Sequence, residues 1–285
     1  MKQHIRLLRP HHWIKNLLMF LPALFSGRLF ECSVLIPCVY GFIALCFVSS
    51  VIYIVNDIRD AEKDKLHPKK CSRPIASGAV PKASASAIAI FLFVVASVMD
   101  ILLCKSIDGM VILLVYIVLN VGYSMGLKEI PLIDILILAS GFVLRVVYGS
   151  AVSGVPVSGW MYLTVMSASL YLGLGKRRNE LSKNGTTSRK VLRLYTYEFL
   201  DKNMYICNAV MIIFYSMWCT TAEITERFGG RMLWSVPLVM VIFMKYSMDI
   251  EGSSDGDPVE VVIHDKVLAM LCTVYALVIT GIVYM

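Results

Sequence analysis

Apolar runs of about twenty residues recur along the whole chain, and they limit most strongly what it can fold into. A helix needs roughly 20 apolar residues to cross about 30 Å of hydrocarbon. The sequence therefore predicts an all-α, multi-pass membrane helical bundle with about nine transmembrane helices. The nine runs lie near residues 14–30, 34–54, 83–103, 110–124, 129–148, 160–175, 204–221, 232–246 and 267–284.

The composition counts against a soluble protein. Hydrophobic residues make up 58% of the 285 residues and charged residues 16%, against roughly 25% charged residues in an average soluble domain. The eight cysteines form no CxxC pair and lie mostly in apolar runs, so we interpret them as small apolar residues. We expect one integral membrane domain over residues 1–285, surrounded by membrane lipids. No nucleic-acid partner is expected, and a homo-oligomer is compatible with the pattern.

The positive charges predict the orientation. If the N-terminus is inside, the segments on the inner side carry 22 lysines and arginines, and the outer segments carry 4. Such an excess is typical of cytoplasmic loops. The N-terminus and the two most charged loops, residues 55–82 and 176–203, are thus expected on the cytoplasmic side of the cell membrane, with the C-terminus outside.

The first charged loop begins with the segment NDIRDAEKD, directly after the second apolar run. Asp57, Asp60 and Asp64 are spaced so that all three carboxylates lie on one face of a helix, and Asn56 joins that face. Converging carboxylates repel one another unless a cation lies between them, and Mg²⁺ prefers such oxygen ligands together with a substrate's phosphates. A solvated charged loop is the alternative, but the position at a membrane boundary favours a metal site.

Two further groups of charged residues are candidates for binding an anion. Lys69 and Arg73 follow the acidic segment, and arginine matches the geometry of phosphate well. The second charged loop begins with the segment KRRNEL, which contains Lys176, Arg177 and Glu180. We interpret this cationic cluster as an anion site facing the acidic segment, and a membrane anchor that touches anionic lipids is the alternative.

The fifth apolar run contains charged residues that are costly in hydrocarbon. Lys128 lies at its start, and Asp134 lies about one turn inside it, where an ionised carboxylate needs a partner. We place both among the substrate-binding residues. Arg145 is about 16 Å further along the helix and cannot pair with Asp134. We expect the guanidinium of Arg145 to extend towards the far membrane surface.

With these residues in view, the chain resembles the UbiA superfamily of intramembrane prenyltransferases. NDIRDAEKD is similar to the NDxxDxxxD motif of that superfamily, and it stands after the second span as the motif does. Several other segments are similar to decaprenyl-phosphate phosphoribosyltransferases and their close relatives, and Cys71 stands where these commonly have arginine. These segments are LRPHHWIKN, HPKKCSRPIASG, YSMGLKEIPLID, SGFVLR and GKRRNEL.

The resemblance implies a Mg²⁺-dependent transferase that moves phosphoribose from phosphoribosyl diphosphate, a small phosphorylated donor, to a lipid-linked polyprenyl phosphate. Asp57, Asp60 and Asp64 would be the catalytic, metal-holding residues with Asn56. Lys15 and Tyr123, which lie in the similar segments, join the substrate-binding residues already named. KRRNEL stands where aromatic prenyltransferases usually carry a second Asp-rich motif.

Two other functions stay open. One is ordinary prenyl transfer from an isoprenyl diphosphate to an aromatic or other acceptor, which the acidic motif allows and KRRNEL argues against. The other is a transporter with an ion path of membrane carboxylates. The sequence disfavours a transporter because the acidic residues gather at one surface and few charged residues, such as Asp134 and Arg145, lie within the apolar runs.

Overall fold

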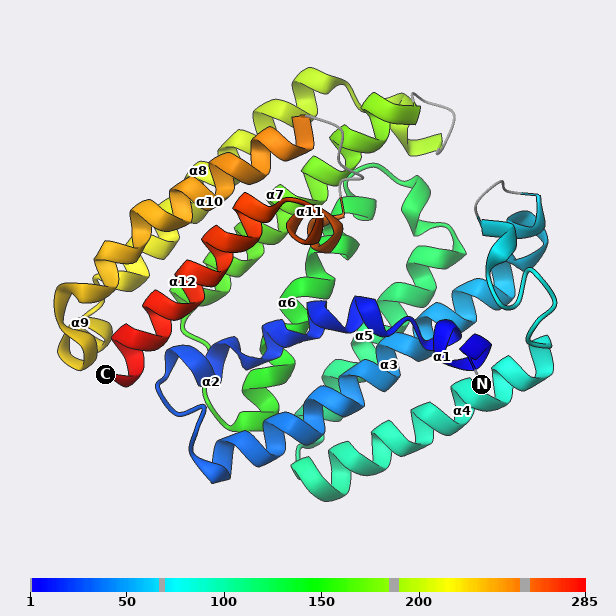
Figure 1. Cartoon of the computed structure of the whole chain (residues 1–285), viewed down its shortest axis with the longest axis horizontal. Helices are drawn as coiled ribbons and strands as arrows, with labels where there is room; N and C mark the ends of the chain where they lie inside the picture. Colours follow the sequence, from blue (N-terminus) through cyan, green and yellow to red (C-terminus); the bar gives the residue numbers. More distant parts are fainter. Residues whose placement is uncertain (1, 67–69, 185–189, 252–256) are drawn as a thin grey trace. The chain divides into compact units, whose positions relative to one another are not determined.

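The structure is a computed structural model, and it describes residues 2–66, 70–184, 190–251 and 257–285. Within these ranges the chain forms helices and no strand, which confirms the predicted all-α class (Figure 1). It divides into two compact units. Residues 1–23, 28–125 and 144–156 form the first unit. Residues 24–27, 126–143 and 157–285 form the second.

The first unit contains the amino-terminal helices and the long helix α3, which spans Cys32–Lys65. Its other elements are α1 (Lys2–Leu8), the 3-10 helix η1 (Pro10–Phe20), η2 (Lys70–Ser72), α4 (Lys82–Val98), the π-helical turn η3 (Met99–Cys104), α5 (Ile107–Met125) and the end of α6 (Ile133–Ser153).

The second unit contains the beginning of α6 and all later helices. In it α7 packs against α8. Its elements after α6 are α7 (Gly159–Asn184), η5 (Lys190–Leu194), α8 (Tyr197–Cys219), α9 (Ala222–Phe228), η6 (Gly229–Ser235), α10 (Val236–Glu251), α11 (Pro258–His264) and α12 (Lys266–Tyr284). The short η4 (Leu127–Glu129) precedes α6, and α2 (Leu21–Phe25) lies where the chain passes from one unit to the other.

Six helices of the described chain are long and apolar enough to cross a membrane. They span Cys32–Lys65, Lys82–Cys104, Ile107–Met125, Ile133–Ser153, Ala222–Glu251 and Lys266–Tyr284. The protein is therefore an integral membrane protein, but the predicted count of nine spans is not confirmed. The helices α7 and α8 cover the sixth and seventh apolar runs without meeting the same requirement.

The first apolar run, residues 14–30, is not one α-helix. It begins inside the 3-10 helix η1 and continues into α2, which is only five residues long. Pro10 is the first residue of η1 and Pro22 is the second residue of α2, positions that suit residues without a backbone N–H to donate. The segment therefore consists of short helical pieces rather than one continuous span.

The close approach of η1 to α6 in the first unit requires a glycine. A Cβ atom on Gly149 would lie 1.8 Å from the backbone oxygen of Met19, so no other residue fits without moving the backbone. Around this contact Met19, Leu45 and Tyr148 are buried in one hydrophobic cluster. The N-terminal segment is consequently part of the packed core rather than an appendage.

The helix α3 is long enough to carry the acidic segment beyond the hydrocarbon. Its 34 residues span about 50 Å at roughly 1.5 Å per residue, while a membrane core is about 30 Å thick. The helix continues without interruption to Lys65. The prediction that Asp57, Asp60 and Asp64 lie on a helix is confirmed.

Candidate active site

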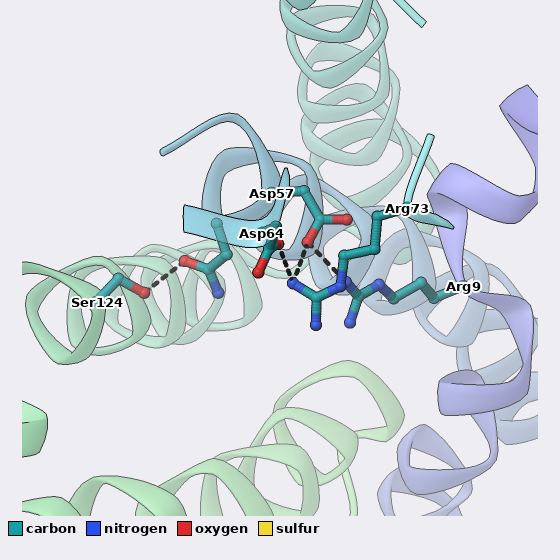
Figure 2. A network of polar contacts seen from close by, with 6 residues as sticks. Arg9, Asp57, Asp64, Arg73 and Ser124 are labelled. Atoms are coloured by element: carbon teal, nitrogen blue, oxygen red, sulfur yellow. Dashed lines mark hydrogen bonds and ion pairs between the residues drawn. The ribbon is translucent and has the colours of Figure 1, made fainter. Parts of the chain in front are cut away.

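The carboxylates of Asp57 and Asp64 are buried at the end of α3, with 2% and 4% of their surface exposed. Arg73 bridges them. Its Nη1 atom donates to Asp64 Oδ2 at 2.6 Å and to Asp57 Oδ1 at 3.2 Å (Figure 2). A buried carboxylate is costly without a partner of opposite charge. In the structure that partner is a guanidinium from the segment after α3.

Arg9, which precedes Asp57 in the chain, contacts the same Asp57 oxygen as Arg73. Its Nη2 atom donates to Asp57 Oδ1 at 2.6 Å (Figure 2). Its guanidinium carbon also lies 5.0 Å from the centre of the Tyr53 ring, a cation–π distance. Arg9 belongs to the segment LRPHHWIKN, but no local pattern marks it as a site residue. Two guanidiniums thus converge on Asp57.

Hydrogen bonds fix the segment around Arg9 along one face of α3. Trp13 Nε1 donates to Ser50 Oγ at 3.1 Å, and the Ser50 hydroxyl donates to the Leu8 carbonyl at 2.9 Å. Asn16 Nδ2 donates to Ser49 Oγ at 3.3 Å. Ser49, Ser50, Tyr53 and Asp57 follow one another at helical spacing, so the N-terminal segment lies along a single polar stripe of α3.

Arg9 itself has a backbone that few residues adopt. Its φ of 51° places it in the left-handed region, between the end of α1 and the start of η1. A non-glycine residue in that region is uncommon and is held there by its surroundings. The bonds to Ser50 on either side of Arg9 are such a constraint. The bend therefore lies at the residue whose side chain contacts Asp57.

Several oxygens at this site have no partner in the described residues. The second oxygen of Asp57, Oδ2, is buried and accepts no hydrogen bond, and half-buried Asp60 has neither a hydrogen bond nor an ion pair there. Asn56 Oδ1 accepts a hydrogen bond from Ser124 Oγ of α5. A buried carboxylate oxygen without a donor is a suitable ligand for a hard cation.

The predicted set of three converging carboxylates is not found. In the described parts of the chain, no three His, Cys, Asp or Glu side chains lie close enough together to hold a metal ion. Arg73 separates Asp57 from Asp64 by bonding both. Mg²⁺ commonly uses only one or two carboxylates and takes its other ligands from water and substrate phosphates. Asp57 and Asp60 therefore fit such an ion when a phosphorylated substrate completes it.

The other predicted substrate-binding residues are divided between the two units. Lys15 and Tyr123 are half-buried in the first unit. Lys69 lies outside the described residues. Lys128, in η4 of the second unit, is half-buried and has no hydrogen-bond or ion-pair partner within the described ranges. Lys128 is thus a cation whose charge the surrounding described residues do not neutralise.

The second unit contains a buried network around Asp134. Arg177 Nε donates to Asp134 Oδ2, and Arg177 Nη1 donates to Glu180 Oε2 at 2.7 Å. Asp134 and Arg177 are both fully buried. The requirement for a partner of Asp134 is met by Arg177. A contact between Arg177 and a substrate phosphate stays a prediction, while the observed contacts make Arg177 the counter-ion of two carboxylates.

Tyr195 completes this network and was not named from the sequence. Its hydroxyl donates to Asp134 Oδ1 at 2.6 Å and accepts the N–H of Leu132 at 2.7 Å. Leu132 has a left-handed backbone, with φ of 67°. Burial, and next the hydrogen bond to Asp134, raise the pKa of Tyr195 well above its usual value, so the hydroxyl stays neutral and keeps donating. Tyr195 thereby fixes the turn before α6.

The two basic neighbours of Arg177 also have acidic partners. Arg178 Nε donates to Asp201, and another nitrogen of Arg178 lies 3.9 Å from Glu251. Lys176 Nζ lies 3.8 Å from Asp257 Oδ2. The sequence showed three adjacent cations, but folding brings carboxylates from α8, α10 and the start of α11 to them. The cluster is much closer to neutral than its sequence indicates.

Arg145 corrects a further expectation. It does not extend to the far surface, because only 7% of it is exposed. Its Nε donates to Asn16 Oδ1 at 2.8 Å and its Nη2 donates to the Tyr116 hydroxyl at 2.6 Å. Its guanidinium carbon lies 5.0 Å from the centre of the Tyr116 ring. The charge is accommodated inside the first unit by polar and aromatic groups, and Asn16 ties it to the N-terminal segment.

Comparison with known proteins identifies the class to which this fold belongs. A model of the UbiA prenyltransferase family matches residues 19–181. A UbiA homolog from Archaeoglobus fulgidus, solved with GPP and Mg²⁺, superposes with a TM-score of 0.73 and 19% identity over 99% of both chains. The chain therefore has the fold of these intramembrane proteins.

Two relatives in sequence are decaprenyl-phosphate phosphoribosyltransferases. The chain is 32% identical to the one from Corynebacterium glutamicum, with 98% of this chain and 86% of that protein covered. It is also 32% identical to the one from Mycolicibacterium smegmatis, with 94% and 88% covered. The chain belongs to the UbiA prenyltransferase family, and it is a transferase.

Proposed function

We propose that this protein transfers phosphoribose from phosphoribosyl diphosphate to a polyprenyl phosphate, with Mg²⁺ at the end of α3. The observation that carries the proposal is the similarity to decaprenyl-phosphate phosphoribosyltransferases along nearly the whole chain. The site supports it, since unengaged carboxylate oxygens lie beside two guanidiniums there. Such a site suits a diphosphate that arrives with a divalent cation.

The residues that would hold Mg²⁺ are Asp57 and Asp60, with Asn56 beside them. Bound there, Mg²⁺ would neutralise the charge that develops on the diphosphate leaving group. In the reaction the bond from the anomeric carbon to the diphosphate oxygen breaks, and an oxygen of the lipid phosphate forms the new bond to that carbon. The lipid phosphate is already an anion, so the protein needs no strong general base.

Lys128 is the cation that we assign to the lipid phosphate. It is half-buried at the start of the fifth apolar run, and it has no hydrogen-bond or ion-pair partner among the residues that the structure describes. An ammonium at that position would attract the phosphate of a lipid whose chain stays in the membrane. Asp134 and Arg177 act in this proposal by fixing, through Tyr195, the turn at Leu132 that follows η4 and Lys128.

Product analysis by mass spectrometry tests this function. Purified protein in lipid nanodiscs is given phosphoribosyl diphosphate and polyprenyl phosphate with Mg²⁺. We expect a polyprenyl phosphoribosyl phosphate and inorganic diphosphate, and neither product once EDTA is added. The matched control is Asp57→Asn, which keeps the size of the side chain and removes a charge.

A second set of substrates separates phosphoribosyl transfer from prenyl transfer. The same preparation receives an isoprenyl diphosphate with an aromatic acid, or with glycerol phosphate derivatives. A prenylated product from these, together with no product from phosphoribosyl diphosphate, would overturn the proposal and assign prenyl transfer instead.

A further inference from the structure

Asp57 carries contacts from two arginines that come from distant parts of the sequence. Arg9 precedes it by 48 residues and Arg73 follows it by 16, yet both donate to the same oxygen, Oδ1. Arg73 also bonds Asp64. Two carboxylates and two guanidiniums thus balance each other at the end of α3. The other oxygen of Asp57, Oδ2, is buried and has no partner in the described chain.

This charge balance determines what else can bind at Asp57. A divalent cation on Asp57 would lie beside two guanidiniums, and like charges at such short range repel strongly in a partly buried site. The cation becomes favourable if a polyanion accompanies it and draws the guanidiniums away. A diphosphate is such an anion, and its oxygens match the planar donors of arginine.

Arg9 is placed to make this change without unfolding its segment. Its neighbours are held on α3 by Ser50, which bonds both Leu8 and Trp13. Its guanidinium also rests over the Tyr53 ring, a contact that does not depend on Asp57. Of its side chain 18% is exposed, so the guanidinium has access to a ligand at the site.

We propose that Arg9 is an exchange residue that competes with a divalent cation for Asp57 and binds the diphosphate once the cation has arrived. Arg73 also competes with the cation, at Asp57 and Asp64. The cation and the diphosphate then bind cooperatively. The diphosphate draws the competing guanidiniums away from Asp57, and the cation releases those guanidiniums to bind the diphosphate. This inference deepens the proposed function and rests on it for the donor, but it requires only that the donor carries a diphosphate.

Binding of Mn²⁺ to the purified full-length protein tests the exchange, with electron paramagnetic resonance to count free Mn²⁺. The probe is Mn²⁺ alone and then Mn²⁺ with inorganic diphosphate, corrected for the complex that the two form in solution. For the wild type we expect diphosphate to raise the affinity for Mn²⁺ by about tenfold, within the usual range of coupling between sites. Reciprocity requires Mn²⁺ to raise the affinity for diphosphate equally.

Arg9→Gln should change the two measurements in opposite directions. Mn²⁺ alone should bind about threefold to tenfold more tightly, because one competing cation is gone, and the enhancement by diphosphate should shrink. Arg6→Gln is the matched control, since Arg6 lies in the same segment and contacts Ser72 rather than a carboxylate. Arg9→Lys should keep the competition and lose part of the enhancement.

Mn²⁺ alone binding to Arg9→Gln as weakly as to the wild type, or more weakly, would overturn the inference. Thermal unfolding shows whether the variant is folded, and if it is not, Arg73→Gln provides the same comparison. The outcome is separate from that of the proposed function. The competition between Arg9 and the cation is measured with Mn²⁺ and inorganic diphosphate. It can therefore be observed even if mass spectrometry finds no phosphoribosyl product, and it can be absent while that product is found.

Discussion

Tyr195 donates a 2.6 Å hydrogen bond to Asp134 across 61 residues of sequence. The same hydroxyl accepts the N–H of Leu132, so one side chain ties the beginning of α6 to the loop before α8. Asp134 has its other oxygen on Arg177. The network has one neutral donor and one charged donor on a single buried carboxylate.

Tyr195→Phe tests the neutral half of this network. The change leaves Asp134 Oδ1 and the N–H of Leu132 without that partner, which we expect to cost about 1–3 kcal/mol of stability. Thermal unfolding in detergent measures the loss. Tyr197→Phe is the control, because Tyr197 is 44% exposed and has no hydrogen bond within the described chain. An equal loss of stability in both variants would contradict a stabilising role of the Tyr195 hydroxyl in this network. Because the pKa of Tyr195 is raised, the difference in stability between the wild type and Tyr195→Phe should stay constant below about pH 10 and disappear only above it.

Arg177→Met tests the charged half. Breaking a buried ion pair from one side typically costs about 3–5 kcal/mol, because the remaining carboxylate is left uncompensated. We therefore expect loss of folded protein in size-exclusion chromatography rather than a selective defect in substrate use. Adding Asp134→Asn should recover part of the loss, as a double-mutant cycle measures. A folded Arg177→Met protein whose only defect is a higher KM for an anionic substrate would instead support direct phosphate contact.

Asp60→Asn separates metal binding from folding. Asp60 is half-buried and has no partner in the described residues, so the change should leave the unfolding temperature unaltered. We expect transfer activity to fall roughly 10²-fold and the Mg²⁺ concentration for half activity to rise. Glu62→Gln is the control, since Glu62 lies on the same helix and pairs only with exposed Lys65 and Lys82 in the described chain. An unchanged Mg²⁺ requirement would exclude Asp60 as a ligand.

Two native cysteines test the orientation in the membrane. Cys32 is exposed at the first residue of α3, and Cys71 is exposed just beyond its other end. The charge distribution predicts that Cys32 is outside and Cys71 is inside. A membrane-impermeant maleimide added to intact cells should label Cys32 and reach Cys71 only after lysis. Cys32→Ser and Cys71→Ser proteins assign the signals, and the reverse pattern would invert the orientation.

Gly149→Ala tests the packing of the N-terminal segment. The added methyl group would meet the backbone of Met19, so η1 must move, and such overpacking costs about 1–3 kcal/mol. The unfolding temperature should fall. Gly281→Ala is the control, because Gly281 lies in α12 with nothing within 4 Å of an added Cβ. Equal stability of the two variants would contradict the contact.

The sequence predicted those features that depend on local spacing. The helical class follows from the length of the apolar runs, and the placement of Asp57, Asp60 and Asp64 on one helix follows from their period. The 3-10 geometry of η1 could not be read in the same way, since residues 14–30 are as apolar as a span. Pro10 and Pro22 were the only local signals of a broken helix.

The contacts that the sequence did not show are those between charges distant along the chain. Arg9 reaches Asp57 through a left-handed backbone that no local pattern indicates. The basic run at residues 176–178 resembles an anion site in the sequence because two of its partners are distant: Glu251 stands 73 residues after Arg178, and Asp257 stands 81 residues after Lys176. A charge run in a membrane protein can thus be neutralised by loops that only the fold brings near.

Because α3 is continuous, its length determines the depth of the acidic segment relative to the bilayer. Its carboxylates belong to the same continuous helix as an apolar stretch long enough to span a membrane, so their height relative to the hydrocarbon depends on the number of helical residues between that stretch and Asp57. In the proposed reaction, the lipid phosphate stays at the level of the head groups while the sugar donor comes from water. The length of α3 then determines the level at which a donor from water and a lipid phosphate at the head groups can meet for transfer of the sugar. Inserting or deleting one turn before Asp57 would shift the acidic segment by about 5.4 Å relative to the bilayer, while leaving every local contact of that segment within the helix unchanged.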